Sequence, residues 1–208
     1  MVTVAAWSRE RTLNSVLNSG KLGVFAMIPL LNAKVLNGSH QHHQKAKSSF
    51  SKVKTMLVCL YDSKGIIHHE FVPEGQTVTG SFYLSVLECL WKRIRRVWPE
   101  YSAPGSWFLL HDNAPVHRAV AVQEFLAGKQ ECVLHHPLYS PDLSPCNYFL
   151  FPKLKLPLKA RLFEDVQDIQ AAVTSSLRAI PQEDVQRSFQ SLLDRANHCI
   201  DAEGMYFE

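Results

Sequence analysis

The stretch that decides the fold runs from Leu109 to Phe151 and reads LLHDNAPVHRAVAVQEFLAGKQECVLHHPLYSPDLSPCNYFLF. Its short apolar start ends at Asp112, and residues 113–146, 34 in all, separate Asp112 from Asn147. A carboxylate that follows a strand of an open α/β sheet projects into the crevice at the sheet edge, where such sheets bind ligands. A lone Asp after a strand more often caps a helix or orders a turn, so a functional role needs support from the wider pattern.

The composition is that of one folded domain. The chain has 208 residues, 46% of them hydrophobic, and a formal net charge of +3. That length buries one sizeable core, and the mild positive charge permits a nucleic-acid partner without predicting one. The five cysteines are odd in number and lack CxxC spacing, which argues against a disulfide framework and a zinc knuckle. The apolar run from Leu22 to Leu31 is too short to span a bilayer, so we expect an intracellular protein without a membrane segment.

The composition changes near residue 50. Residues 1–50 contain Asn-rich turns and a His/Gln tract at 40–44, which predict a leader or linker that is partly disordered. From residue 51 to residue 208 the pattern is globular. The apolar runs Val53 to Tyr61 and Ile66 to Val72 flank turn residues, which predicts a β-hairpin.

Helical and strand patterns alternate after the hairpin. Apolar residues from Phe82 to Trp98 recur at three- and four-residue spacing, which predicts an amphipathic helix from Thr79. The further expected elements are strands at 106–110 and 132–135 and helices at 116–126, 164–179 and 183–200. This order predicts an α/β fold, a mixed sheet with helices on its faces.

The residues HDNAPVH at 111–117 and PLYSPDLSPCNYFLF at 137–151 resemble the catalytic core of mariner-type transposases. The similarity extends from about Lys52 to the C-terminus. It implies an RNase H-like fold and an acidic triad that binds two Mg²⁺ or Mn²⁺ ions for the cleavage and transfer of DNA strands. Two such ions activate the attacking oxygen and stabilise the leaving oxygen of a phosphodiester. On this resemblance, Asp112 and Asn147 are the candidate catalytic and metal-binding residues.

The chain departs from the family pattern at the first acid. In that family the first catalytic Asp lies on a central strand before the hairpin, in a Gly-Asp-Glu context, and no such motif occurs here. We therefore expect the first catalytic strand to be missing or replaced, with Lys21 to Leu31 as the hypothetical replacement that pairs the inner sheet edges. Pro29 fits a central strand poorly, so a detached or helical leader is an equal alternative. The helix-turn-helix region that precedes the family's catalytic domain is also absent, so the sequence resembles a truncated copy.

The third acid of the family pattern is replaced by Asn147. An amide oxygen can coordinate a hard cation, but it adds no charge and cannot act as a general base, so metal affinity should fall. The alternative is that Asn147 caps the helix that begins near Cys146. Asp142 is a nearby carboxylate that could compensate, although a loop-ordering role is the simpler interpretation. Glu10 is the only acid before Asp62.

A second set of candidate residues is basic. A basic edge on the helix after Thr79 is usually a solvated face, but the resemblance implies phosphate contacts that weaken as salt rises. For His117, packing inside the domain is the alternative to a phosphate contact. The candidate nucleic-acid-binding residues are Lys92, Arg93, Arg95, Arg96, His117 and Arg118.

Three functions are compatible with the sequence. The favoured one is a mariner transposase-derived DNA-binding domain in which metal-dependent cleavage and strand transfer are lost or strongly impaired, because one metal carboxylate of three is recognisable. The alternatives are a residual Mg²⁺- or Mn²⁺-dependent DNA endonuclease or transposase, and a non-catalytic protein-interaction module. DNA is the expected partner, with no small-molecule substrate and no cofactor other than the divalent metal of an active form. The resemblance also implies a homodimer and a nuclear location.

Overall fold

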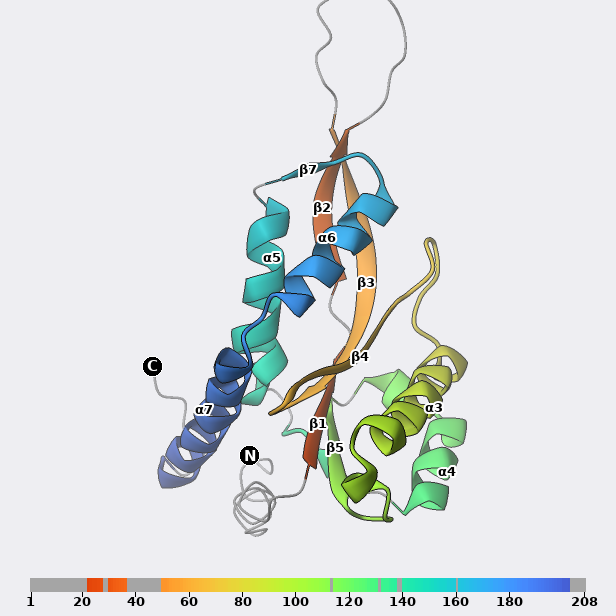
Figure 1. Cartoon of the computed structure of the whole chain (residues 1–208), viewed down its shortest axis with the longest axis vertical. Coiled ribbons are helices and arrows are strands. Elements are labelled where there is room, and N and C mark those ends of the chain that lie inside the picture. Colours follow the sequence, from red (N-terminus) through yellow and green to blue (C-terminus); the bar gives the residue numbers. More distant parts are fainter. Residues whose placement is uncertain are drawn as a thin grey trace, which may run out of the picture.

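The fold is a mixed sheet with helices on both faces (Figure 1). The computed structural model describes residues 22–27, 30–36, 50–112, 114–130, 132–137, 140–159 and 161–202. The strands are β1 (Leu22–Met27), β2 (Leu30–Leu36), β3 (Phe50–Asp62), β4 (Gly65–Phe71), β5 (Trp107–His111), β6 (Cys132–His135) and β7 (Leu162–Phe163). The longer helices are α3 (Gly80–Val97), α4 (Val120–Lys129), α5 (Phe151–Lys159), α6 (Val166–Arg178) and α7 (Gln182–Asp201). None of these helices is long and apolar enough to cross a membrane.

β1 fills the centre of the sheet, between β3 and β5. Ala26 pairs with Leu60 of β3 in antiparallel and with His111 of β5 in parallel. A strand in this position satisfies the backbone groups of two neighbours that would otherwise face each other unpaired. The hypothesis of a replacement strand is therefore confirmed for Leu22–Met27, and the alternative of a detached or helical leader is wrong for these residues. Pro29 lies outside the described residues.

β2 corrects the domain boundary predicted at residue 50. This strand pairs with the first half of β3 in antiparallel and with β7 in parallel. Its Leu31 is fully buried and its Ala33 nearly so, because the thirteen-residue β3 extends the core beyond the hairpin. β1 and β2 thus belong to the folded unit and not to a linker. Residues 1–21 and 37–49, with Glu10 and the His/Gln tract, lie outside the described residues.

Most elements expected after residue 50 are confirmed. The hairpin is β3 and β4, and α3 begins after Thr79, whose hydroxyl accepts a hydrogen bond from the N–H of Phe82 at 3.1 Å. The helix expected at 116–126 is divided into a 3₁₀ turn, η2 (Pro115–Arg118), and α4, because Ala119 between them has an extended backbone. The final two helices, α6 and α7, begin and end within a few residues of their predicted bounds.

The segment after Cys146 is helical in an unexpected way. A π-helical turn, η4 (Cys146–Leu150), leads directly into α5, and the N–H of Phe151 donates to the carbonyl oxygen of Cys146, five residues back. Pro152 follows at once. A proline has no N–H, and its ring clashes with the carbonyl one turn earlier in a regular helix, so the wider π turn accommodates it. The helix start expected near Cys146 is confirmed, but its continuation past the two prolines of this segment was not predicted.

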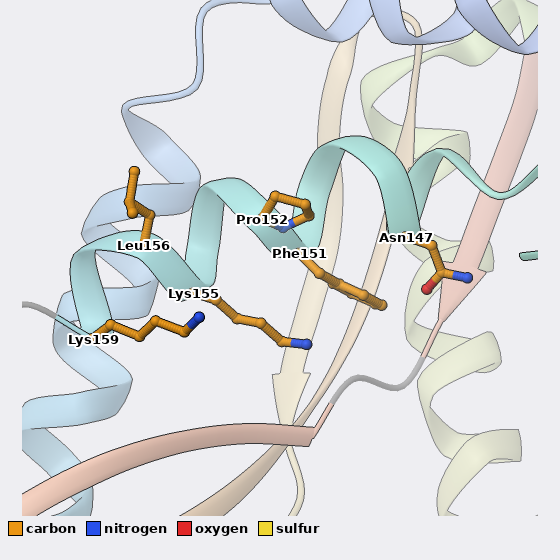
Figure 2. A pocket seen from close by; sticks show the side chains of 6 residues that line it. All are labelled: Asn147, Phe151, Pro152, Lys155, Leu156 and Lys159. Carbon is orange, nitrogen blue, oxygen red and sulfur yellow. The ribbon is translucent and has the colours of Figure 1, made fainter. Parts of the chain in front are cut away.

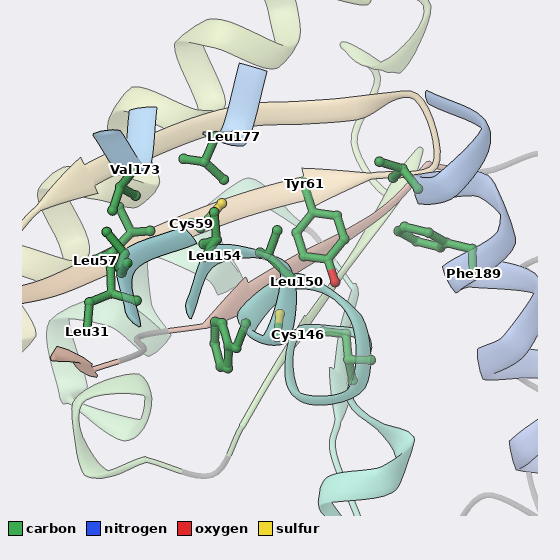
Figure 3. Packing of buried hydrophobic residues seen from close by; sticks show 14 of the residues in the cluster. Leu31, Leu57, Cys59, Tyr61, Cys146, Leu150, Leu154, Val173, Leu177 and Phe189 are labelled. Carbon is green, nitrogen blue, oxygen red and sulfur yellow. The ribbon is translucent and has the colours of Figure 1, made fainter. Parts of the chain in front are cut away.

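The core has one layer on each face of the sheet. Along β3, Leu57, Cys59 and Tyr61 face α5, α6 and α7, whereas Val58 and Leu60 face α3 and α4. This alternation is the two-residue period of a strand that is buried on both sides. Figure 3 shows the first layer, in which Cys146, Leu150 and Leu154 of η4 and α5 pack beneath Tyr61 and Leu57.

A buried carboxylate closes the hairpin between β3 and β4. Asp62 is fully buried, and its Oδ1 accepts hydrogen bonds from the N–H groups of Lys64 at 2.8 Å and Gly65 at 2.9 Å. Its Oδ2 is buried without a hydrogen-bond partner in the described part of the chain. Burial raises the pKa of Asp62 to about 6, although the two backbone hydrogen bonds and the Lys64 charge oppose the rise.

This raised pKa predicts a pH-dependent stability. The native state holds the proton more tightly than the unfolded chain, whose carboxyl has a pKa of 3.8, so the free energy of unfolding falls as pH rises through about 6. Asp62→Asn keeps the acceptor oxygen without the charge. We expect it to stabilise the protein above pH 7 by up to about 3 kcal/mol, at about 1.36 kcal/mol per pKa unit, and to lose this advantage below pH 4. Urea unfolding at several pH values measures this, with the exposed Asp194→Asn as control. Equal gains at all pH values would contradict the assignment.

Candidate functional site

β5 brings Asp112 to one edge of the sheet. β1 and β6 run parallel to β5, so the carboxyl ends of three strands meet at this edge. Asp112 follows the last residue of β5, and its side chain is 44% exposed. Its Oδ1 accepts a hydrogen bond from the N–H of Ala114 at 3.0 Å. The edge therefore presents a fixed carboxylate to solvent, in the place where open α/β sheets bind ligands.

The buried His117 ring contacts Asp112 from the interior of the domain. Its Nδ1 lies 2.9 Å from Oδ1 of Asp112 and 2.9 Å from the backbone oxygen of the same residue. The His117 ring stacks on His111, with centroids 4.5 Å apart and planes at 11°, and it contacts the ring of Tyr83 at 4.3 Å. The Tyr83 hydroxyl in turn lies 3.1 Å from Nδ1 of His111. His117 is only 1% exposed, so the packing alternative is correct, and the predicted phosphate contact of His117 is not compatible with its burial.

Hydrogen bonding keeps Asp112 ionised. Burial alone raises the pKa of Asp112, but hydrogen bonds from the His117 ring and the Ala114 N–H outweigh it, helped by the charges of His117 and His111. The net effect holds the pKa of this carboxyl below its usual value. The Nε2 atom of His117 is buried without a hydrogen-bond partner among the described residues. The polar contacts of this ring among those residues are therefore made by Nδ1, to Asp112.

The residue on β1 at the level of Asp112 and the residue at the third motif position are both uncharged. Ala26 pairs with His111, so continuing the parallel register by one residue sets Met27 at the level of Asp112. Asn147 is the second residue of η4, and its Nδ2 donates to the backbone oxygen of Pro141 at 3.3 Å. Because η4 has no side-chain cap, the capping interpretation of Asn147 is wrong. Burial raises the pKa of the Cys146 thiol, and the Asp112 charge raises it further, so the start of η4 lies within electrostatic reach of Asp112.

The donor atoms at this edge do not fit a pair of divalent ions. A two-metal site needs several charged oxygens around the ions. In the described ranges of the chain, no three His, Cys, Asp or Glu side chains are grouped so that they could hold a metal. Asp142 is exposed in the 3₁₀ turn η3 (Pro141–Leu143) and does not complete such a group with Asp112. Asp112 is the one charged member of the expected triad.

The basic residues of α3 border a groove on one face of the sheet. Lys92, Arg93, Arg95 and Arg96 are all exposed. We define the α3 groove as the depression of about 350 Å³ that is lined by His68, Cys89, Lys92, Arg93 and Arg96. His68 comes from β4, and the other four residues come from α3. Arg95 does not line this groove, and Arg118 is exposed on η2.

The α3 groove lies away from Asp112. Tyr83, in the first turn of α3, contacts His111 at the end of β5, whereas Trp91 contacts Trp107 at the start of β5, with ring centroids 5.6 Å apart. The helix and the strand therefore run in opposite directions. A strand rises about 3.3 Å per residue, so the α3 groove begins roughly 15 Å from the Asp112 edge. The residues predicted to bind nucleic acid are thus divided between two regions.

Two basic residues that line a groove with Asn147 were not predicted from the sequence. A second groove, of about 400 Å³, is lined by Asn147, Phe151, Pro152, Lys155, Leu156 and Lys159. Figure 2 shows Asn147, Lys155 and Lys159 along one side of the helix formed by η4 and α5. The four-residue spacing of the two lysines was the available signal, but Pro157 between them argued against a helix.

Removal of the His117 side chain should raise the pKa of Asp112. In His117→Ala the hydrogen bond to Oδ1 is lost, so we expect the pKa of Asp112 to rise towards or above its usual value, because burial then dominates. The titration of the Asp112 carboxyl carbon by NMR measures this. Arg118→Gln is the matched control, since neither the hydrogen bonds nor the charges that lower this pKa involve Arg118. An unchanged Asp112 pKa in a folded His117→Ala protein would show that His117 does not position the carboxylate.

Comparison with known proteins connects this geometry to one family. A family model described as "Transposase (partial DDE domain)" matches residues 32–103. The mariner Mos1 transposase of Drosophila mauritiana is 27% identical over 208 residues, which is 100% of this chain and 60% of that protein. The histone-lysine N-methyltransferase SETMAR of Homo sapiens is 30% identical over 155 residues, 74% of this chain and 23% of that protein. The chain thus spans less than two thirds of the length of either relative.

The likeness extends to three dimensions. The Mos1 transposase catalytic domain, solved with Raltegravir and Mn, superimposes with a TM-score of 0.77 at 27% identity, over 100% of this chain and 92% of that one. The overall fold of this chain is therefore that of the Mos1 transposase catalytic domain. Over its whole length the chain is similar to the catalytic domain of a mariner-type transposase, and it has the RNase H-like fold of that domain.

Proposed function

We propose that this chain is a DNA-binding domain derived from a mariner transposase, in which metal-dependent cleavage and strand transfer are lost or strongly impaired. The observation that carries the proposal is the isolation of Asp112. Met27 stands at its level on β1 and Asn147 on η4, so neither neighbouring element adds a negative charge at these positions. The affinity of an oxygen site for a hard cation falls as charged ligands are lost. The proposal includes a nuclear location and self-association, as for a protein that acts on DNA in the manner of its relatives.

DNA binding is supported by the α3 groove. Three full positive charges, Lys92, Arg93 and Arg96, line a depression of about 350 Å³ together with His68. Among the ion pairs of the described residues, none neutralises any of these three cations. Phosphate groups are the usual partners of such clusters, and their binding releases counterions from DNA. Contacts of this kind position DNA without selecting its sequence.

A residual nuclease is the second candidate, and the state of Asp112 favours it. This carboxylate is ionised, 44% exposed and held in place by His117. One correctly oriented ligand is therefore retained at the sheet edge. Its partners in the described residues are insufficient for metal binding, so an active form would need a carboxylate from elsewhere.

Plasmid nicking separates the two candidates. We expect the purified protein to leave supercoiled plasmid intact with Mg²⁺ or Mn²⁺, as Asp112→Ala does. The double variant Met27→Asp/Asn147→Asp adds one carboxylate on β1 and one on η4, and we expect it to bind Mn²⁺ at least about tenfold more tightly, a gain of about 1.4 kcal/mol or more. Calorimetry measures the binding. Nicking by the parent protein that disappears in Asp112→Ala would overturn the proposed loss of cleavage.

Protection of Cys89 tests DNA binding at the α3 groove. This cysteine is exposed and lines the groove, whereas Cys59 and Cys146 are buried. We expect a short DNA duplex to slow alkylation of Cys89 at low salt and the protection to disappear between about 50 and 200 mM salt. Mass spectrometry of the Cys89 peptide gives the rate.

Arg93→Gln/Arg96→Gln should remove most of this protection. It should also make the negative slope of log affinity against log salt shallower by about 1.8, at about 0.9 per lost phosphate contact. Lys129→Gln, on α4 and outside the groove, is the matched control. Equal alkylation rates with and without DNA at low salt would exclude the α3 groove as a DNA contact.

A further inference from the structure

The groove beside Asn147 is built differently from the α3 groove. All of its described lining residues belong to one continuous helical segment, η4 followed by α5. We call it the α5 groove. It lies on the opposite face of the sheet, because α5 packs on the layer that contains Leu57 and Tyr61, whereas α3 packs on the layer that contains Val58 and Leu60. The two cationic grooves therefore cannot be parts of one depression.

Two unpaired ammonium groups line the α5 groove. Lys155 and Lys159 are four residues apart, so they lie about 6 Å apart along the helix axis, at 1.5 Å per residue. Neither takes part in an ion pair of the described residues, whereas Lys153, on the same helix, pairs with Asp184. The Lys155 ammonium lies 5.7 Å from the centre of the Phe151 ring. Two positive charges along one side of α5 thus have no acidic partner among the described residues.

Asn147 extends this line of donors towards Asp112. An amide group carries two N–H donors, and the 3.3 Å hydrogen bond to Pro141 uses one of them. A side-chain amide also has no charge, so it does not repel an anion held by Lys155 and Lys159. An aspartate at this position would instead place a negative charge at that end of the groove.

The groove suits a phosphate backbone and not a base. Among its described lining residues, the one aromatic ring is that of Phe151, which is 7% exposed and so gives little surface for stacking. Binding of single strands through bases depends on exposed aromatic faces. Ammonium and amide groups instead donate to phosphate oxygens and carry no information about sequence.

We propose that the α5 groove binds the phosphodiester backbone of DNA without a metal ion, through Asn147, Lys155 and Lys159. The proposal rests on the DNA-binding function proposed above and identifies a second surface for it. It also gives Asn147 a positive role. In this chain the amide is a phosphate donor that an aspartate could not replace, because a carboxylate has no proton to donate at neutral pH and repels the ligand.

The test is DNA affinity in EDTA, measured by fluorescence anisotropy across a range of salt concentrations. Lys155→Gln/Lys159→Gln should make the negative slope of log affinity against log salt shallower, by about 1.8 for a duplex and about 1.4 for a single strand. At about 0.1 M salt we expect its affinity to be at least about tenfold lower. Lys153→Gln is the matched control, because Lys153 lies on α5 but contacts Asp184 and the Phe149 ring outside the groove. Its salt slope should stay that of the parent.

The DNA affinity of Asn147→Asp separates a phosphate-donor role of Asn147 from that of an impaired metal ligand. If Asn147 donates to phosphate, the variant binds DNA more weakly than the parent in EDTA. If Asn147 is merely an impaired metal ligand, the variant matches the parent in EDTA and binds DNA more tightly once Mg²⁺ is added. The second pattern would overturn the inference. Circular dichroism and thermal unfolding confirm that the variants are folded.

The outcomes for the two proposals are distinguishable. An unchanged salt slope in Lys155→Gln/Lys159→Gln, together with weaker binding by Arg93→Gln/Arg96→Gln, would overturn the α5 groove and leave the DNA-binding function in place. Failure of the parent protein to bind DNA at any salt concentration would overturn both.

Discussion

The parallel pairing of β1 with β5 is the constraint on which the rest of the structure depends. It sets the level of Met27 against Asp112, it separates β3 from β5, and it allows helices to cover both faces of the sheet. A backbone ladder of this kind requires N–H and C=O groups but places no demand on the chemistry of a side chain at the strand end. A strand can therefore keep its structural position whatever side chain stands at its end. In this chain the central position of β1 depends on its backbone pairing and not on a charged residue at Met27.

The elements predicted correctly are those whose sequence patterns are local. The hairpin and α3 have strong periodic patterns, with turn residues at Asp62 and a cap at Thr79, and they were predicted correctly. β2 was missed because its polar Asn32 and Lys34 lie beside an Asn-rich stretch, and its role as a strand comes from pairing with the long β3. The start of a helix near Cys146 was predicted, but its continuation as α5 was not, because Pro152 and Pro157 signal the end of a helix.

The site was predictable in its motif and not in its geometry. Asp112 and Asn147 were found from their spacing, and the structure sets Asp112 at the end of β5 and Asn147 on η4. The burial of His117 could not be derived from sequence, because it depends on Tyr83 and His111, which approach from two other elements. The division of the basic residues also has a spatial cause. α3 runs opposite to β5, so the same helix has Tyr83 at the Asp112 edge and its cationic end at the far edge.

The position of β1 also has a consequence for how the chain is made. Leu22 pairs with Trp107, and the difference between these positions is 85 residues. β3 reaches one edge of β1 early, but the other edge has no partner until β5 has been synthesised. At roughly 5 to 20 residues per second, an apolar strand with an open edge persists for about 4 to 17 seconds on each nascent chain. Long-range parallel pairing of this type forms slowly and leaves the chain open to aggregation. The central strand that completes the sheet is therefore also the strand whose open edge must be protected while the chain is synthesised.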